Sequence, residues 1–339
     1  MLSLNAIIGF QLIIPAIVVN GEYCPSDPDV ISPCSCDGKR IKCVATEPID
    51  LAPIMELLLN GAENRSYETF ELMSTAVTKL DAYMFKGVQF NQIILTGCSQ
   101  LACVHPMAFG GQEASVTRFE ATLTNLSSLR GKDCDLFGAL SSLTCLESIA
   151  IIGSEWTKIP DQAFNNKLGD QVNLTTITFS NGGSGGKLQR IGKEAFSALK
   201  ALKQLDVSYH NLTRVDDSAF NLSDYIGDGM TINLMGNALT GTSFGGDIVT
   251  DGAVTQLKLG ANRVLKYLPQ NVFKGVFKAN KKNTIDLSGD LMEIDLNNKW
   301  LVEQKVSLDL NHRLLHAIGA DGRPLLSHTI EEMNKPPKY

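Results

Sequence analysis

Few residues of this chain have the spacing of a catalytic or metal-binding group. His312 and His316 lie four residues apart, which on a helix would let two imidazoles share a metal ion. The leucines around them, however, make this segment a strand and a turn. The glycine-rich run 181–187 lacks the spacing of a phosphate-binding loop, and Leu188 stands where that loop needs a hydroxyl. We expect a flexible loop there, and no catalytic, cofactor or metal site in the chain.

The cysteines offer a different chemistry. Cys24, Cys34, Cys36 and Cys43 lie close together, directly after an apolar N-terminal segment. Clustered cysteines in a secreted chain indicate disulfide bonds. Zinc binding is the alternative, but the C-x-C spacing, the lack of a nearby histidine and the oxidising secretory route oppose it. We therefore expect residues 22–50 to form a disulfide-bonded cap.

The N-terminal segment 1–21 is typical of a signal peptide. Its apolar core covers residues 7–19, interrupted by Pro15, and Val19 and Gly21 suit cleavage after Gly21. A membrane anchor is the alternative, but the run is shorter and more interrupted than a span of about 20 residues requires. No later segment has the pattern of a second span or a lipid-anchor tail. The sequence predicts a secreted, extracellular protein without a membrane anchor.

One segment, 202–220, indicates the fold. Its apolar residues are Leu202, Leu205, Val207, Leu212, Val215 and Phe220. They occupy relative positions 1, 4, 6, 11, 14 and 19, a series that neither a helix nor a strand period produces. The series matches a leucine-rich repeat, in which positions 4 and 6 point inward from a short strand and position 9 turns the chain. One such coil cannot bury its own apolar face, so copies must stack on it.

Copies of this pattern run through the chain, about ten of them, each of about 23 to 30 residues. Their inward residues are Phe70/Leu72/Val77/Leu80/Phe85, Ile93/Leu95/Leu101/Val104/Phe109, Phe119/Ala121/Leu126/Leu129, Leu146/Ile149/Ile151/Trp156/Ile159/Phe164, Leu174/Ile177/Phe179/Leu188/Ile191/Phe196, Ile232/Leu234/Leu239, Val254/Leu257/Leu259/Val264, Ile285/Leu287/Met292 and Leu308/Leu310/Leu315/Ile318. We expect an α/β leucine-rich-repeat solenoid over residues 51–320, with a parallel sheet on its concave side and irregular or short helical segments on its convex side. A short cap without disulfides and a loose tail should follow at 321–339.

Position 9 of the repeat is irregular, and the composition sets further limits. Asparagine usually fills this position, but here it also holds His210 and Arg313. We expect His210 to be a buried turn residue bonded to the backbone. With 44% hydrophobic residues the chain can bury a core, and a net charge of −6 without a basic cluster opposes nucleic-acid binding.

The N-terminal cysteines carry a resemblance. The pattern C-x9-C-x-C-x6-C before the repeats resembles the cysteine cap of extracellular leucine-rich-repeat proteins. The string CPSDPDVISPCSC looks like the start of secreted arthropod proteins similar to the non-catalytic subunit of oplophorus-luciferin 2-monooxygenase. The resemblance implies pairing of Cys24 with Cys36 and of Cys34 with Cys43, where sequence alone leaves three pairings open. It also implies a non-catalytic role beside a smaller secreted enzyme.

Four further cysteines, Cys98, Cys103, Cys134 and Cys145, lie inside the repeats. In a secreted chain we expect them to pair, and we favour the local pairs Cys98–Cys103 and Cys134–Cys145 while other pairings stay open. Cys98 falls at the turn position, where a reduced, buried cysteine is also common.

Five N-x-S/T sequons offer sites for N-glycosylation. They begin at Asn64, Asn125, Asn173, Asn211 and Asn221. Asn125 and Asn211 both fall at position 10 of the repeat, between inward-facing residues, so we expect their side chains to be exposed.

Position 5 of each coil points out of the concave sheet, because positions 4 and 6 point in. Along the array it holds Glu71, Ile94, Glu120, Ala150, Thr178, Asp206, Asn233, Lys258, Asp286 and Asp309. Acids outnumber bases five to one in this column. Positions 7 and 8 add apolar anchors at Ile152, Met235, Leu123 and Tyr209. A solvated sheet face would also need polar residues, but the pattern favours a basic extracellular protein bound on this face.

Two functions remain open. In the first, the chain is a non-catalytic partner or stabilising subunit of another secreted protein. In the second, it is a soluble recognition protein of the extracellular matrix or of innate immunity that binds a glycan or microbial ligand. Co-purification separates them, because a subunit elutes with a stoichiometric partner.

Replacing Cys34 and Cys43 with serine should lower the free energy of unfolding by about 2 to 5 kcal/mol. The loss should begin as fraying at the N-terminal end, because each repeat is stabilised only by its neighbours. Hydrogen exchange along the chain measures this. Normal secretion together with unchanged melting of the double variant would contradict the cap assignment.

Overall fold

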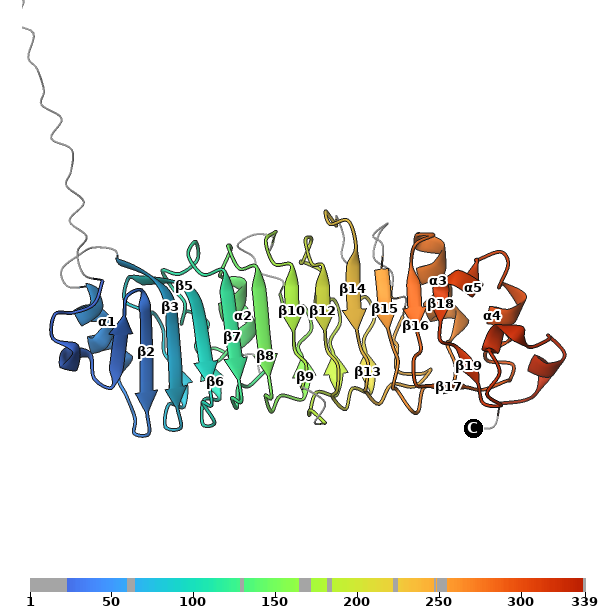
Figure 1. Cartoon of the computed structure of the whole chain (residues 1–339), viewed down its shortest axis with the longest axis horizontal. Coiled ribbons are helices and arrows are strands. Elements are labelled where there is room, and N and C mark those ends of the chain that lie inside the picture. Colours follow the sequence, from blue (N-terminus) through green and yellow to red (C-terminus); the bar gives the residue numbers. More distant parts are fainter. Residues whose placement is uncertain are drawn as a thin grey trace, which may run out of the picture.

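A sheet of 12 strands runs the length of the molecule. The computed structural model describes residues 23–59, 65–128, 131–164, 172–181, 185–221, 225–246, 248 and 255–337. Figure 1 shows the strands side by side along an elongated solenoid, from β1 at one end to β18 near the other. The signal-peptide prediction for 1–21 and the sequon at Asn64 lie outside the described residues.

The strands of this sheet follow one another in chain order. They are β1 (Cys34–Asp37), β2 (Arg40–Ala45), β3 (Arg65–Ser74), β5 (Val88–Thr96), β7 (Arg118–Thr122), β8 (Ser148–Ile152), β10 (Thr176–Thr178), β12 (Gln204–Asp206), β14 (Met230–Asn233), β15 (Thr255–Lys258), β16 (Thr284–Asp286) and β18 (Leu314–Leu315). β1 and β2 form an antiparallel hairpin, and each later pair of neighbours is parallel. A solenoid with a parallel concave sheet, as the repeat pattern predicts, is therefore confirmed.

One inward row of side chains joins the coils. In register it contains Phe70, Ile93, Phe119, Ile149, Ile177, Leu205, Ile232, Leu257, Ile285 and Leu314. All of them are buried, because each coil covers the apolar face of the coil before it. Behind this row, the segment that leads from one strand back to the next ends in a residue that stacks on the equivalent residue of the neighbouring coil. The rings of Phe164, Phe196 and Phe220 stack with centroids 5.9 Å apart at both steps.

The return segments consist of two-residue strands and short helices. The small sheets are β4 (Lys79–Leu80) with β6 (Cys103–Val104), β9 (Lys158–Ile159) with β11 (Arg190–Ile191) and β13 (Arg214–Val215), and β17 (Leu291–Met292) with β19 (Ile318–Gly319). The helices are η1 (Pro28–Ile31), α1 (Leu51–Leu59), α2 (Leu136–Ser141), α3 (Gln270–Ala279), α4 (Lys299–Glu303), α5 (Leu310–Arg313), η2 (Leu325–Ser327) and η3 (Glu332–Asn334).

The cap disulfides have the pairing that the resemblance implies. Cys24 is bonded to Cys36 and Cys34 to Cys43, the latter across the β1–β2 hairpin. The pairing favoured for the inner cysteines is wrong, because Cys103 is bonded to Cys134.

Neighbouring coils explain the inner pairing. Cys103 and Cys134 are 31 residues apart, about one repeat, so stacking brings them together. Cys98 and Cys145 are free thiols. Cys98 is buried at the turn position, with its sulfur 3.4 Å from the carbonyl oxygen of Leu72, and it therefore takes the part of the usual asparagine.

The C-terminal coils depart from the predicted frame. Val264 was predicted to point inward, but it is 51% exposed and Leu265 is buried instead. In the last coil a short helix, α5, occupies the segment predicted as a strand, and the strand β18 begins at Leu314. The template could not distinguish these choices, because apolar residues stand at both alternative positions.

The segment 321–337 contains a short packed cap, and its last residues, 334–337, are exposed. Leu325, His328 and Met333 are buried in it. In the preceding coil, the guanidinium of Arg313 donates to the carbonyl oxygens of Asn283, Leu308, Phe277 and Asn280 at 2.6 to 3.0 Å. Two of these oxygens belong to the end of α3 and the residue that follows it, so this arginine caps a helix C-terminus.

Position 9 forms a ladder of buried polar side chains. Asn237 donates to the carbonyl oxygens of Val207 and Leu234 at 2.8 and 3.0 Å. Asn262 repeats this arrangement one coil later. Asp290 occupies the next step, where its Oδ2 accepts from the N–H of Asn262 at 3.1 Å but its buried Oδ1 has no partner among the described residues. Burial raises the pKa of Asp290 to about 6.

Asp290→Asn should stabilise the protein more at pH 7.5 than at pH 4.5. The folded-state pKa of about 6 lies above the ordinary aspartate value of 3.8. Ionisation of the carboxylate therefore lowers stability as pH rises through this window, and the loss persists above it. Two pKa units correspond to about 3 kcal/mol. Urea unfolding at both pH values measures the gain, with Asp228→Asn at a 94% exposed side chain as control. An equal gain at both pH values would contradict the assignment.

Candidate binding surface

The outward row of the sheet contains nine of the ten residues predicted for it. Strand register aligns Glu71, Ile94, Glu120, Ala150, Thr178, Asp206, Asn233, Lys258 and Asp286 in one row. The prediction that Asp309 belongs to this row is wrong, because Asp309 has a left-handed backbone (φ 51°) and directly precedes α5. Leu315 takes its place beside Asp286.

Several acids of this row have basic neighbours, which the sequence prediction missed because it counted charges only at position 5 of the repeat. Lys42 Nζ lies 2.9 Å from Glu71 Oε1, and Arg118 Nη2 lies 2.7 Å from Glu120 Oε2. The imidazole of His316 approaches Asp286 at 2.9 Å.

Asp206 is bound differently, since its Oδ1 accepts from the backbone N–H of Ser208 at 2.9 Å. Two of the four acids in the row, Glu71 and Glu120, are therefore paired with a lysine or arginine of the same chain. Charge alone gives weaker support for a basic partner than the sequence suggested.

Position 8, just beyond the strands, has a left-handed backbone in most coils. Glycine occupies it at Gly97, Gly153, Gly236 and Gly289, with φ between 64° and 84°. Leu123 (φ 54°), Tyr209 (φ 60°) and Ala261 (φ 58°) occupy the same position. A residue with a Cβ is disfavoured there by about 1–2 kcal/mol, so a bulky side chain at this position needs an explanation.

Leu123 and Tyr209 share one arrangement. The N–H of Leu123 donates to the carbonyl oxygen of Ile152 at 2.9 Å, and that of Tyr209 donates to the carbonyl oxygen of Met235 at 2.9 Å. A Cβ added to Gly153 would lie 3.2 Å from Leu123 Cδ2, and one added to Gly236 would lie 2.5 Å from Tyr209 Cδ1. Each bulky side chain thus lies over a glycine of the next coil. We call Leu123 with Ile152, and Tyr209 with Met235, the two rim pairs.

Both rim pairs present apolar surface to solvent. Leu123 is 63% exposed and Tyr209 is 40% exposed. They follow β7 and β12, which are separated by β8 and β10 in the sheet. Three strand spacings correspond to about 14 Å. The concave face therefore carries two apolar contact points along one edge, a pattern that a protein partner can use.

The histidines do not converge on a site. His312 lies in α5, where a strand and a turn were predicted, and approaches Asp309 at 2.8 Å. His316 approaches Asp286 instead. His210 is buried at the turn, as predicted, and burial lowers its pKa. Gly186 of the glycine-rich run packs directly against its ring, which shields His210 from solvent.

Within the described segments no group of three or more histidine, cysteine, aspartate or glutamate side chains could hold a metal ion. The same part of the chain contains no helix long and apolar enough to cross a membrane.

The four described sequon asparagines, Asn125, Asn173, Asn211 and Asn221, are all exposed. Asn125 follows Leu123 by two residues and Asn211 follows Tyr209 by two. Glycosylation there stays a prediction, but glycans would stand beside the rim pairs.

Comparison with known proteins bears on the fold. A family model described as the BspA type leucine rich repeat region matches residues 137–229 in 6 copies. No curated protein sequence gives a match. The fold is similar to a crystal structure of human 5T4 (Wnt-activated inhibitory factor 1, trophoblast glycoprotein), with 14% identity over 93% of this chain and 100% of that chain, and a TM-score of 0.45.

A second similar structure is the Drosophila Toll–Spatzle complex, with 15% identity and a TM-score of 0.43. That match covers 77% of this chain, which spans only 38% of the chain it matches. The repeat match, the parallel sheet and the two cap disulfides define a leucine-rich-repeat solenoid with an N-terminal cysteine cap.

Gly236→Ala should destabilise the protein more than Gly97→Ala. Both glycines are left-handed, with φ +66° and +64°, but an added Cβ meets the Tyr209 ring only at Gly236 and nothing within 4 Å at Gly97. Both variants carry backbone strain of about 1–2 kcal/mol. Any additional loss of stability in Gly236→Ala therefore measures the cost of displacing the Tyr209 ring. A double-mutant cycle with Tyr209→Ala tests this. If the difference persisted without the ring, the proposed packing would be wrong.

Proposed function

We propose that this chain is an extracellular binding protein without chemistry of its own, which takes a protein partner on the concave face along the two rim pairs. The observation that carries the proposal is the pair of exposed bulky side chains on left-handed backbone, at Leu123 and Tyr209. Strained positions persist only where the surrounding structure enforces them, and they cluster at functional sites. Glycine would relieve the strain at both positions, as it does in neighbouring coils.

The disulfides support an extracellular location. Three bonds join Cys24 to Cys36, Cys34 to Cys43 and Cys103 to Cys134, and such bonds persist in oxidising compartments. The predicted signal peptide agrees with this location.

The rim pairs and the charged row would contribute differently to binding. Buried aromatic and aliphatic side chains supply most of the affinity of a protein interface. Paired charges such as Lys42–Glu71 and Arg118–Glu120 mainly affect the association rate and its salt dependence. The rim pairs are therefore the expected centre of the interface, and the acids its periphery.

The resemblance to the non-catalytic luciferase subunit adds a hypothesis about the partner. On that basis the partner is a smaller secreted enzyme, which the solenoid holds and stabilises. The geometry of the rim pairs fits any protein with two apolar contacts about 14 Å apart, since that spacing comes from the strands alone.

A second candidate is recognition of a glycan. A cleft of about 610 Å³ at the start of β3 and β5 is lined by Tyr23, Lys39, Arg65, Ser66, Tyr67, Glu68, Asn91, Gln92 and Thr117. Tyr23 is 43% exposed, and an aromatic ring among amide and hydroxyl groups suits a sugar. In this case Tyr23→Ala should abolish glycan binding while the rim pairs are dispensable.

Purification of the secreted chain with its natural partner tests the first proposal. Leu123→Ala and Tyr209→Ala should each raise the dissociation rate about 10- to 100-fold and leave the association rate nearly unchanged, as losing interface anchors does. Surface plasmon resonance measures both rates. Ile330→Ala, at a 47% exposed apolar residue in the C-terminal cap, is the matched control. Wild-type rates in both rim variants would exclude the concave edge as the binding site.

A further inference from the structure

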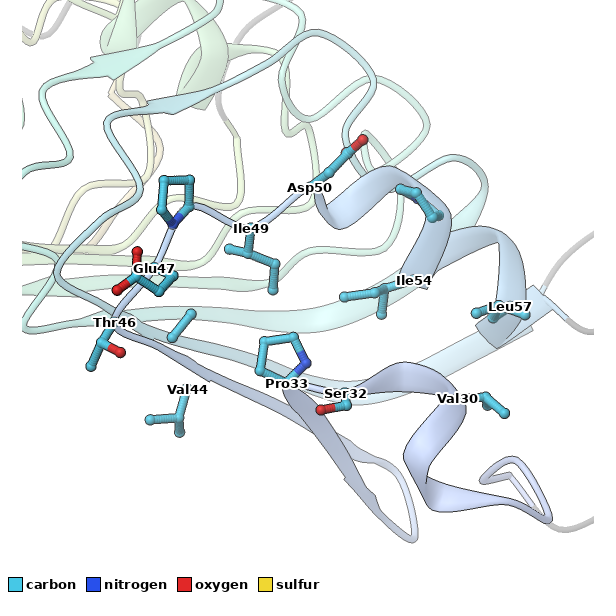
Figure 2. Close-up of a pocket in the computed structure, with 13 residues that line it drawn as sticks. Val30, Ser32, Pro33, Val44, Thr46, Glu47, Ile49, Asp50, Ile54 and Leu57 are labelled. Atoms are coloured by element: carbon cyan, nitrogen blue, oxygen red, sulfur yellow. The ribbon is translucent and has the colours of Figure 1, made fainter.

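A second candidate site lies at the N-terminal end of the solenoid. A groove of about 580 Å³ is bounded by three segments: the end of η1 with the residues after it (30–33), the end of β2 with the link to α1 (44–50), and one face of α1 (53–57). Figure 2 shows Pro33, Ile49 and Ile54 in its middle, with Val30 and Leu57 toward one end and Thr46 and Glu47 toward the other.

Apolar and polar side chains both line the groove, and three of the apolar ones are exposed. Val30, Val44 and Leu57 line it and are 42%, 52% and 46% exposed. Ile54, by contrast, is buried, and with Leu51, Met55 and Leu58 it anchors α1 to the core. Leu57 is therefore not needed to hold the helix in place. Clustered exposed apolar side chains on a soluble protein mark an interaction site.

The charges at the groove are all of one sign. Glu47 and Asp50 are its only charged lining residues, and both are exposed. Asp50 Oδ1 accepts from the N–H of Ala52 at 3.0 Å, whereas Glu47 forms no ion pair with any residue that the structure describes. The charge available for an incoming basic group is therefore that of Glu47, beside the exposed Val44 and Leu57.

We propose that this groove binds an extended segment of a partner protein in which a large apolar side chain lies next to lysine or arginine. The apolar side chain would fill the space between Pro33, Ile49 and Ile54, and the basic group would approach Glu47. The exposed flanks at Val30, Val44 and Leu57 leave room for the backbone of such a segment. This site is separate from the rim pairs and does not depend on the function proposed for them.

A peptide array tests the proposal with the intact secreted chain. The probes are dye-labelled octapeptides, glycine and serine apart from a central pair that combines leucine, isoleucine, phenylalanine, methionine or tryptophan with lysine, arginine, serine or glutamate. We expect binding where an apolar residue adjoins lysine or arginine, and at least tenfold weaker binding when the neighbour is serine or glutamate. No binding by any peptide, or binding regardless of the neighbouring charge, would overturn the proposal.

Variants then place the site. Leu57→Ser and Val44→Ser should each weaken binding of the best peptide at least tenfold, and Glu47→Lys should remove its preference for a basic residue. Both apolar positions are about half exposed, so the fold should survive, which an unchanged melting temperature verifies. Ile330→Ser and Glu331→Lys, at exposed residues of the opposite end, are the matched controls.

Two results would assign the groove to another occupant and so reject the proposal. One is a dimer in analytical ultracentrifugation that Leu57→Ser dissociates, which would make a second copy of the chain the occupant. The other is a small apolar dye that binds with the same sensitivity to Leu57→Ser while no peptide competes. Tyr209→Ala should leave peptide binding unchanged, so failure here and failure at the concave face are distinguishable.

Discussion

The structure depends on burial of one row of apolar side chains between successive coils. Each member of the row, such as Leu205, is covered by its counterparts in the coils on either side, here Ile177 and Ile232. No coil can bury this row alone, so the first and last coils need covers. The same stacking brings residues one repeat apart into contact. It thereby creates the disulfide between Cys103 and Cys134 and the polar ladder from Asn237 to Asp290.

The fold could be predicted because its cause is local. A series of inward residues repeats within each coil. Leu129 and Val254 lie outside the described residues, and the structure places most of the others in the core. The features that were missed depend on which residues meet across coils. Glu71 pairs with Lys42 of the cap strand β2, and Glu120 pairs with Arg118, which is not at position 5 of its repeat. Counting charges at position 5 of the predicted repeats alone therefore overstated the negative charge of the face. Asp309 was misplaced because leucines on either side satisfied the template equally well, and only packing against Ile285 selects Leu314.

The unusual backbone at position 8 was likewise hidden in the sequence. Leucine and tyrosine at this position gave no sign that their φ angles are positive, although the glycines in other coils hinted at it. Once the register is known, the same two residues appear in a common arrangement over Gly153 and Gly236. An apolar side chain in a strained and exposed place adds nothing to the core. The binding role proposed for these two residues would account for both occurrences.

The two ends of the solenoid show that the N-terminal groove is not a necessary result of capping. At the C-terminal end Trp300 donates to the carbonyl oxygen of Leu268 at 2.7 Å, and Arg313 satisfies the carbonyl groups near the end of α3. The cleft that remains there, about 270 Å³, holds Arg323 paired with both Asp321 and Glu332 at 2.8 Å. At that end, Arg323 is thus paired with acids of the same chain. The N-terminal end is closed by two disulfides, but Val44 and Leu57 remain exposed beside Glu47, which has no ion pair among the described residues. The apolar and basic segment proposed above would match this arrangement.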